Sequence, residues 1–273
     1  IGLELSKHLT AVHPGHELVE EQEIERLLPQ QPQRMRAILR LDHGEALLVQ
    51  PPDQQPGRAS DWAARQVYMA HFTLTDAQAR DFHYFERFER GAAGLAGARG
   101  EPAFSVWLRD WSVEQTGPDT YRLTAAAGDV GLDLTLLDTK GIILQGDRGY
   151  SRKGPEPGNA SYYYSLTRIA AEGTVTVRGQ TFVVTGLAWM DHEFSTSALG
   201  PEQVGWDWFS IQLDDQTELM VFQLRRADGS VDAFSSGTLI AEDGSTRTLG
   251  PADFTITDPD GKQISYEYDA RGD

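Results

Sequence analysis

The 273-residue sequence contains no cysteine. This absence excludes disulfide bonds, thiolate metal sites and cysteine nucleophiles. Positive charge is also scarce, because 24 lysines and arginines stand against 41 aspartates and glutamates, for a formal net charge of −17. Nucleic acids and anionic membrane surfaces are bound by basic patches, so neither partner is expected. No apolar run approaches the roughly 18 residues of a transmembrane helix, so no membrane-spanning segment is expected.

The first 57 residues differ in character from the rest of the chain. The pattern from Glu17 to Leu28 predicts a short amphipathic helix, with apolar residues near one face and glutamates on the other. A stretch rich in proline, glutamine and glycine follows at 51–57 and is typical of a linker. We therefore expect residues 1–57 to form a poorly ordered or atypical segment with one short helix.

From residue 58 onward, short alternating runs bounded by turn residues predict antiparallel β-structure. The clearest alternation is Val130, Leu132, Leu134 and Leu136 with small or polar residues between them. Arg178-Gly179-Gln180 is typical of a tight hairpin turn. Strands are predicted at 66–75, 82–88, 104–113, 121–126, 130–136, 174–177 and 181–192.

After Pro201 the turn signals recur at near-equal intervals, which predicts a β-meander with one strand per interval. These signals are Asp214-Asp215, Asp228-Gly229, Asp243-Gly244 and Asp258-Pro259. The block has too few strands to close a barrel alone. We therefore expect two β-domains, 58–198 and 199–273, of which the second is incomplete.

Titratable and aromatic side chains gather at 189–194 and 205–209. Strand parity places His192 on an apolar face with Met190, and places Asp191 and Glu193 on the opposite face. Asp207 also falls on an apolar face. Burial favours the protonated form of a carboxyl, and a protonated carboxyl can act as a general acid. The alternative is that Asp207 lies at a strand end, where it caps a turn or pairs with an arginine.

Other interpretations of the polar residues stay open or are weak. His192 is either catalytic or a hydrogen-bonded core histidine, and His71 allows the same two interpretations. Tyr163 lies in a run of three tyrosines that either lines a pocket mouth or serves as a good sheet former. No metal site is predicted, because the HExxH spacing is absent and adjacent strand residues point apart. Ser195 and Ser197 lie near His192, but no Gly-x-Ser-x-Gly elbow supports a serine hydrolase.

Several unusual short sequence motifs occur in the same order as in the AttH-domain family, so the chain resembles this family. This family includes the carotenoid 1,2-hydratases and bacterial proteins labelled predicted secreted hydrolases. The resemblance spans roughly residues 58 to 258. These motifs are Ser60–Ala63, Gln66–Phe72, Leu144–Gly149, Lys153–Tyr164, Trp189–Glu193 and Gln203–Phe209.

The resemblance implies a pair of lipocalin-like β-barrels with a site near their junction. The family's hydratases protonate an isolated double bond with an aspartate and add water to the resulting cation. His192 matches the histidine of their His-x-Trp pair, while Phe194 stands where the tryptophan would be. Asp207 is the best match for the aspartate. The expected fold is therefore all-β, with two consecutive antiparallel lipocalin-like barrels, the second truncated.

The leading expectation is an enzyme, a hydratase (lyase) or hydrolase-like protein, that acts on an apolar small molecule by acid–base chemistry without a cofactor. Hydration, hydrolysis and isomerisation are all compatible with it. The alternatives are a non-catalytic lipocalin-like binding protein for a hydrophobic ligand and an attachment-related surface protein. By analogy the location is periplasmic or secreted, with the cytoplasm as the alternative. The expected catalytic residues are Asp207, His192, Asp191 and Glu193, and the expected substrate-binding residues are Trp189, Trp206, Trp208, Tyr163 and His71.

Overall fold

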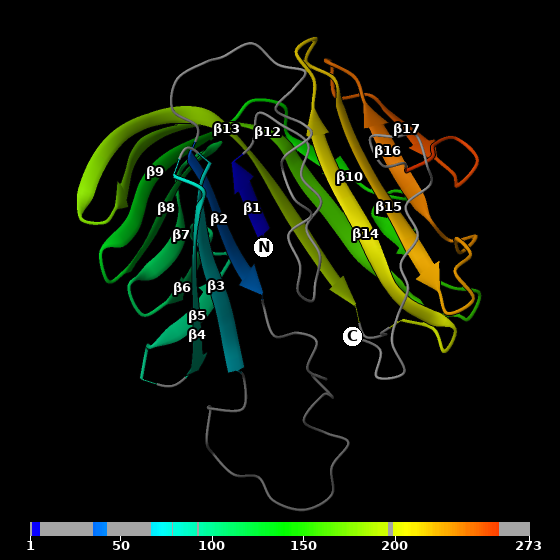
Figure 1. Ribbon diagram of the computed structural model, residues 1–273, viewed down its shortest axis with the longest axis horizontal. Coiled ribbons are helices and arrows are strands. Elements are labelled where there is room, and N and C mark those ends of the chain that lie inside the picture. The colour runs from blue at the N-terminus through cyan, green and yellow to red at the C-terminus, as the bar shows by residue number, and fades with distance from the viewer. Residues whose placement is uncertain are drawn as a thin grey trace, which may run out of the picture. The chain divides into compact units, whose positions relative to one another are not determined.

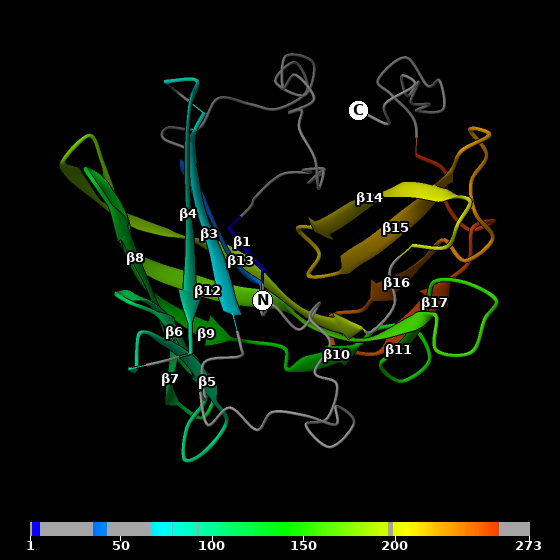
Figure 2. The ribbon, with the colours of Figure 1, turned by 90° about the horizontal axis from the view of Figure 1, so that it is seen from below.

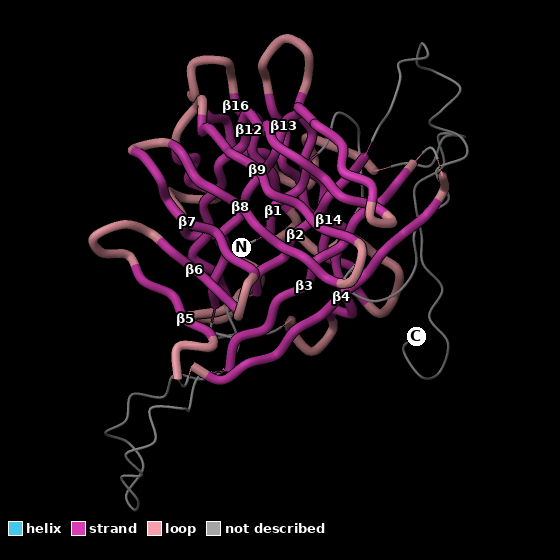
Figure 3. The backbone as a smooth tube through the Cα atoms, turned by 90° about the vertical axis from the view of Figure 1, so that its left-hand side faces the viewer, coloured by secondary structure: helices cyan, strands magenta, loops and turns pink. Residues whose placement is uncertain are grey.

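The computed structural model describes residues 2–5, 35–42, 67–77, 79–91, 93–195 and 199–256. Every regular element in these ranges is a β-strand, and Figure 3 shows only strands and loops. The all-β prediction is therefore confirmed. Within the same ranges, no helix is long and apolar enough to cross a membrane. The predicted helix at Glu17–Leu28 and the turn at Asp258-Pro259 lie outside the described residues.

The larger of two sheets has thirteen strands in the order β4-β3-β2-β1-β13-β12-β9-β8-β7-β6-β5, with β10 and β11 paired to β12 (Figure 1). Its neighbours pair antiparallel, as Figure 2 shows for β3 beside β4. The strands are β1 (Gly2–Leu5), β2 (Met35–Asp42), β3 (Val67–Asp76), β4 (Asp81–Arg90), β5 (Ala96–Arg99), β6 (Ser105–Leu108), β7 (Trp111–Gly117), β8 (Thr120–Ala127), β9 (Val130–Asp138), β10 (Ile142–Leu144), β11 (Tyr150–Arg152), β12 (Ala160–Val177) and β13 (Gln180–Ser195).

The smaller sheet is a four-stranded antiparallel meander, in the order β14-β15-β16-β17. Its strands are β14 (Gln203–Gln212), β15 (Glu218–Arg226), β16 (Ser236–Ile240) and β17 (Thr246–Leu249). The predicted turn signals at Asp214, Asp228 and Asp243 fall in the three connections between them. Gly229 and Gly244 adopt positive φ values of 81° and 80°, which a residue without Cβ tolerates best. The predicted meander is confirmed as far as residue 256.

The strand prediction differs from the structure in several places. The segment 104–113 forms two strands, β6 and β7, because Arg109 takes a left-handed conformation (φ 57°) and Leu108 pairs with Trp111 across the turn. No strand was predicted between 137 and 173, yet Tyr150–Arg152 pairs with the start of β12, and β12 itself begins at Ala160. In residues 1–57, β1 and β2 also pair with each other, and the sequence pattern did not predict them.

Most of the large sheet belongs to one compact unit of the chain, called unit 1. The hydrophobic core of unit 1 lies on one face of this sheet. In β9, alternate residues point to this face, because successive side chains of a strand point to opposite sides of the sheet. As the alternation of apolar and polar residues predicted, the buried ones are Val130, Leu132, Leu134 and Leu136. Residues of β3, β5, β6, β7, β8, β12 and β13 complete the same core cluster. The buried face is filled by aliphatic and aromatic side chains, and their removal from water is the main stabilising contribution to the unit.

The terminal strands β4 and β5 of the large sheet have no ladder between them in the described residues, but side chains connect β4 with β7 and β8. The Arg87 guanidinium of β4 lies 4.0 Å from the ring centroid of Trp111 and donates to the Ala126 carbonyl at 3.0 Å. Arg87 also pairs with Asp110. Trp111 Nε1 donates to the same carbonyl at 2.8 Å. These side-chain contacts connect β4 with β7 and β8, whereas no backbone ladder joins the terminal strands β4 and β5 in the described residues.

The described residues group into two compact units. Unit 1 takes 2–5, 35–42, 67–77, 79–91, 93–142 and 165–195, and unit 2 takes 143–164 and 199–256. This grouping differs from the consecutive segments 58–198 and 199–273, because 143–164 joins the later block. Strand β12 contributes to both units, with 160–164 in unit 2 and 165–177 in unit 1.

Candidate functional site

In unit 1 the candidate residues lie at the end of β13. Trp189 is almost fully buried, with 2% of its surface exposed. Its Nε1 donates to Asp191 Oδ1 at 2.9 Å, so the two residues share a face as strand parity predicted. The hydroxyl of Ser165, a fully buried residue of β12, donates to the same carboxylate oxygen. Asp191 is thus a carboxylate held in place by two donors.

His192 is half-buried and follows Asp191 on the other face of β13. Its ring lies 5.3 Å from the ring of Phe194, at an interplanar angle of 41°. Burial lowers the pKa of His192 below its usual value of 6.5, because the charged imidazolium loses hydration. At neutral pH the side chain is therefore a neutral imidazole, a form that can accept a proton. Glu193 and Phe194 are exposed.

The lowered pKa of His192 predicts how stability depends on pH. Below about pH 6.5 the unfolded chain binds a proton at this residue before the folded chain does, so the free energy of unfolding falls as pH falls. The slope from one histidine is at most about 1.4 kcal/mol per pH unit. Urea unfolding of the wild type and of His192→Gln at pH 7.5 and pH 5.5 measures it. The variant should lose less stability on acidification, and an equal or greater loss would contradict the assignment.

In unit 2, Asp207 is a buried carboxyl of β14, with 3% of its surface exposed. Arg225 of β15 lies on the same face, since Gly205 pairs with Arg225 and Asp207 with Gln223. Arg225 Nε is 3.8 Å from Asp207 Oδ2. A Cβ at position 205 would lie 2.6 Å from an Arg225 terminal nitrogen, so glycine makes room for the guanidinium. The arginine pairing that the sequence left open is present.

The Asp207–Arg225 pair has two opposing electrostatic effects. Burial favours the protonated acid, whereas a nearby guanidinium favours the ionised carboxylate. At 3.8 Å the two groups are beyond hydrogen-bond distance, so the arginine acts as a neighbouring charge. A carboxyl under both influences is suited to give and receive a proton during a reaction.

The opposite face of β14 carries its tryptophans, because Trp206 and Trp208 alternate with Asp207 along the strand. Trp206 pairs with Leu224, and Trp208 pairs with Phe222. Trp208 Nε1 donates to the hydroxyl of Tyr163 at 3.1 Å. Within unit 2, Trp208 and Tyr163 are therefore in contact, on the face of β14 opposite Asp207, and their substrate-binding role stays a prediction.

His71 lies elsewhere in unit 1, on β3. Its ring is 5.5 Å from that of Tyr84, and its Nε2 is 3.9 Å from Glu86 Oε2. Tyr84 Oη also donates to Glu86 at 3.1 Å. These contacts tie His71 to the outward face of β4, where alternate residues are exposed. The substrate-binding role of His71 stays a prediction.

Three participants were missed by sequence reasoning. Ser165 reaches Asp191 from a neighbouring strand, Arg225 reaches Asp207 across a ladder, and Lys153 lies over the aromatic rings of unit 2. The first two contacts depend on strand register and the third on the path of the loop between β11 and β12, and a single sequence reveals neither. The pairing of His192 with Asp207 stays a prediction, because the two residues belong to different units. In the described part of the chain, no three histidine, aspartate or glutamate residues group as metal ligands.

Comparisons with known proteins were made by family model, sequence and structure. A protein from Nitrosomonas europaea assigned to AttH is similar with a TM-score of 0.69 and 27% identity, over 97% of this chain and 74% of its own. Kievitone hydratase from Nectria haematococca is similar in fold, with a TM-score of 0.59 and 11% identity, over 98% of this chain and 70% of its own. Comparison with curated proteins finds none that matches. A family model described as AttH-like matches residues 46–266.

Proposed function

Because the chain belongs to the AttH-like family, we propose that it is an enzyme that acts on an apolar small molecule by acid–base chemistry. The observation that carries the proposal is the buried carboxyl of Asp207 with Arg225 at 3.8 Å. Removing an ionisable pair from water costs desolvation free energy, which the attraction between the two groups repays only when their geometry is excellent. Buried ionisable groups are therefore concentrated at functional sites. The similar fold of a hydratase supports addition of water as the reaction.

In the proposed reaction, the protonated carboxyl of Asp207 transfers its proton to one carbon of an isolated double bond. Arg225 favours the carboxylate that remains, by its positive charge. A water molecule then bonds to the cationic carbon and releases one proton to solvent. The proton returns to Asp207 through solvent, so the net change is the addition of one water molecule. Asp191, which Ser165 and Trp189 hold in place, and Glu193 lie on the opposite face of β13 from His192 and are kept as further candidate residues of unit 1.

Aromatic side chains are proposed to bind the apolar part of the substrate. Trp206 and Trp208 are half-buried, and ring faces stabilise a nearby cation by about 0.5–2 kcal/mol. Trp189 and Tyr163 are almost fully buried, so their predicted binding role would be to support the residues around them. His71, which lies far from these residues in the sequence, stays a proposed binding residue. This division assigns proton transfer to Asp207 in unit 2 and binding to the aromatic residues, and His192 in unit 1 stays a separate candidate base.

The test begins with the apolar compound that co-purifies with the full chain, identified by mass spectrometry. The protein is then incubated with that compound in water enriched in ¹⁸O. Hydration predicts a product heavier by one water molecule that carries the ¹⁸O label. A compound that is bound tightly but recovered unchanged after long incubation would instead indicate a lipocalin-like binding protein. The absence of any bound compound, together with an interaction confined to the protein surface, would favour an attachment role.

A further inference from the structure

Strand β4 has a polarity opposite to that of β3, the strand with which it pairs. The residues of β3 that face the core of unit 1 are apolar, and Ala70, Phe72 and Leu74 have none of their surface exposed. The half-buried positions of β4 on the same side carry four ionisable side chains and one phenylalanine, namely Asp81, His83, Phe85, Arg87 and Glu89. Apolar packing of β4 against the core therefore rests on Phe85, whose ring lies 5.7 Å from that of Phe72.

Two ionisable side chains of β4 pair with the turn between β6 and β7. Arg87 pairs with Asp110, and Glu89 pairs with Arg109. The hydrogen bond from Arg87 holds the pKa of Asp110 below its usual value, so this carboxyl is charged at neutral pH. The boundary formed by these four residues is called the seam.

The first residue of β4 makes a third ion pair, with the turn between β12 and β13. Asp81 pairs with Arg178, and the pKa of Asp81 lies below its usual value mainly because of this hydrogen bond. His83 also faces Asp81, with its Nε2 3.3 Å from Asp81 Oδ2. Because Asp81 lies at the opposite end of β4 from Glu89, this pair holds the start of the strand independently of the seam.

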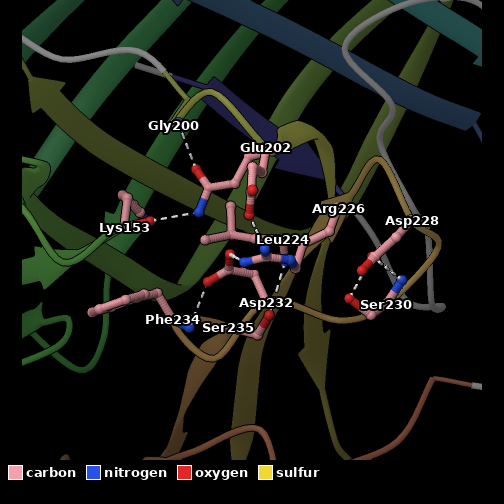
Figure 4. Close-up of polar contacts among 11 residues, drawn as sticks. Lys153, Gly200, Glu202, Leu224, Arg226, Asp228, Ser230, Asp232, Phe234 and Ser235 are labelled. Carbon is pink, nitrogen blue, oxygen red and sulfur yellow. Dashed lines mark hydrogen bonds and ion pairs between the residues drawn. The ribbon is translucent and has the colours of Figure 1, made fainter.

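No backbone ladder crosses the seam in the described residues, although β4 and β6 lie close together. Apolar contact across it includes the packing of Phe72 against Trp111. In unit 2, by contrast, Arg226 pairs with Glu202 and Asp232 and also belongs to the β14–β15 ladder (Figure 4). Partly exposed ion pairs change an equilibrium by only about 1.5- to 5-fold each and weaken as salt rises. A boundary held by such pairs without a ladder opens more easily than the rest of the sheet.

We propose that the seam is a salt-sensitive latch through which unit 1 opens locally. When the ion pairs of Arg87 and Glu89 separate, the β3–β4 hairpin moves away from β6 and β7 while its own ladder stays intact. The core side of β3, with Ala70 and Phe72, then becomes accessible from solvent while the rest of the sheet stays folded. The opening gives small molecules transient access to the apolar core of unit 1, and it does not depend on the proposed acid–base function.

The chain contains no cysteine, so one introduced thiol reports on one position. Ala70→Cys places this reporter opposite Arg87 in the β3–β4 ladder. Ala171→Cys is the matched control, because Ala171 belongs to the same core and its strand, β12, has laddered neighbours on both sides. Each full-chain variant is labelled with the neutral reagent iodoacetamide, and labelling is followed by mass spectrometry. The thiol at position 70 should react at least about 10-fold faster, because local opening is more frequent than global unfolding.

Urea distinguishes the two routes to the core. Labelling at position 70 should respond weakly to low urea, because the opening exposes little surface, whereas labelling at position 171 should follow the slope of global unfolding. If Ala70→Cys does not fold, Ala125→Cys takes its place. Ala125 belongs to the same core and precedes Ala126, whose carbonyl accepts from Arg87.

Charge removal tests whether the ion pairs hold the seam. Asp110→Asn is expected to raise labelling at position 70 by about 2- to 5-fold, because its pair with Arg87 is lost in the open state. The control is Asp133→Asn, which removes a partly exposed ion pair with Arg122 that the opening leaves intact. It should leave labelling at position 70 within about 1.5-fold while raising labelling at position 171. An increase in NaCl from about 0.05 M to about 0.5 M should accelerate labelling at position 70, and less so in Asp110→Asn.

Equal labelling rates at positions 70 and 171, with the same dependence on urea, would show that only global unfolding exposes the core and would overturn the proposal. An equal effect of Asp110→Asn and Asp133→Asn on labelling at position 70 would also overturn it, because the seam pair would then have no special part in the opening. Labelling at position 70 that does not respond to salt counts against a latch made of ion pairs.

Discussion

An Asp207→Asn variant is expected to lose about 10²- to 10⁴-fold of the turnover of the compound that the wild type converts, the usual contribution of a positioned acid or base. The amide has the shape of the acid but cannot transfer a proton. Because Arg225 lies 3.8 Å from Asp207 Oδ2, the substitution also leaves a cation with a neutral neighbour in a largely buried place. Turnover is measured by product formation under single-turnover conditions, and the folded fraction by urea unfolding.

The matched control is Asp214→Asn, at an exposed position in the turn that follows the same strand. It removes one negative charge from the same unit and should leave turnover within about 2-fold of the wild type, as is usual for surface substitutions. If Asp207→Asn is folded and reacts at the wild-type rate, Asp207 is not the proton donor. The proposed acid–base mechanism would then need another acid.

Trp111→Ala is expected to destabilise the protein by about 3–5 kcal/mol, the range for truncation of a buried tryptophan. Trp111 is fully buried, and its ring packs edge-on against Phe72 at a centroid distance of 5.8 Å. Its loss also removes the ring beneath the Arg87 guanidinium and one donor to the Ala126 carbonyl. Urea or thermal unfolding at constant pH measures the change.

Trp111→Phe separates the contributions of packing and hydrogen bonding. It keeps an aromatic ring against Phe72 but removes the indole N–H, so the expected loss is smaller, about 1–2 kcal/mol. Arg87, which donates to the Ala126 carbonyl at 3.0 Å in the wild type, is expected to keep this hydrogen bond, which limits the cost. Equal unfolding free energies for the wild type and Trp111→Ala would show that the contacts between β4 and β7 do not support the sheet.

Much of the fold was predictable because its signal is local. Alternation at Val130, Leu132, Leu134 and Leu136 follows directly from the period of a strand with one face in the core. The hairpin turn at Arg178-Gly179 was predictable because consecutive left-handed residues suit a two-residue connection, and both residues have positive φ. The split of 104–113 was not, since Arg109-Asp110 carries no strong turn signal of its own.

The arrangement of the candidate residues was predictable only within a single strand, where alternation determines which side chains share a face. Trp189 and Asp191 share a face, as expected, and a hydrogen bond joins them. The partners that define their chemistry come from other strands. Arg225 meets Asp207 because Gly205 pairs with Arg225, and Ser165 meets Asp191 from β12. Register between strands depends on the whole sheet, so no short pattern in one chain could have identified these partners.

Strand β1 joins Gly2 to Asp191 and Leu5 to Ala188, so the earliest described strand is closed by one of the latest in its unit. During synthesis, residues 2–5 cannot complete this ladder until 188–191 have emerged, whereas β3 and β4 can pair as a local hairpin as soon as both exist. Contacts of such long sequence separation form slowly, because a large loop must close first. The segment that carries Trp189 and Asp191 is therefore expected to acquire its final neighbours among the last steps of folding.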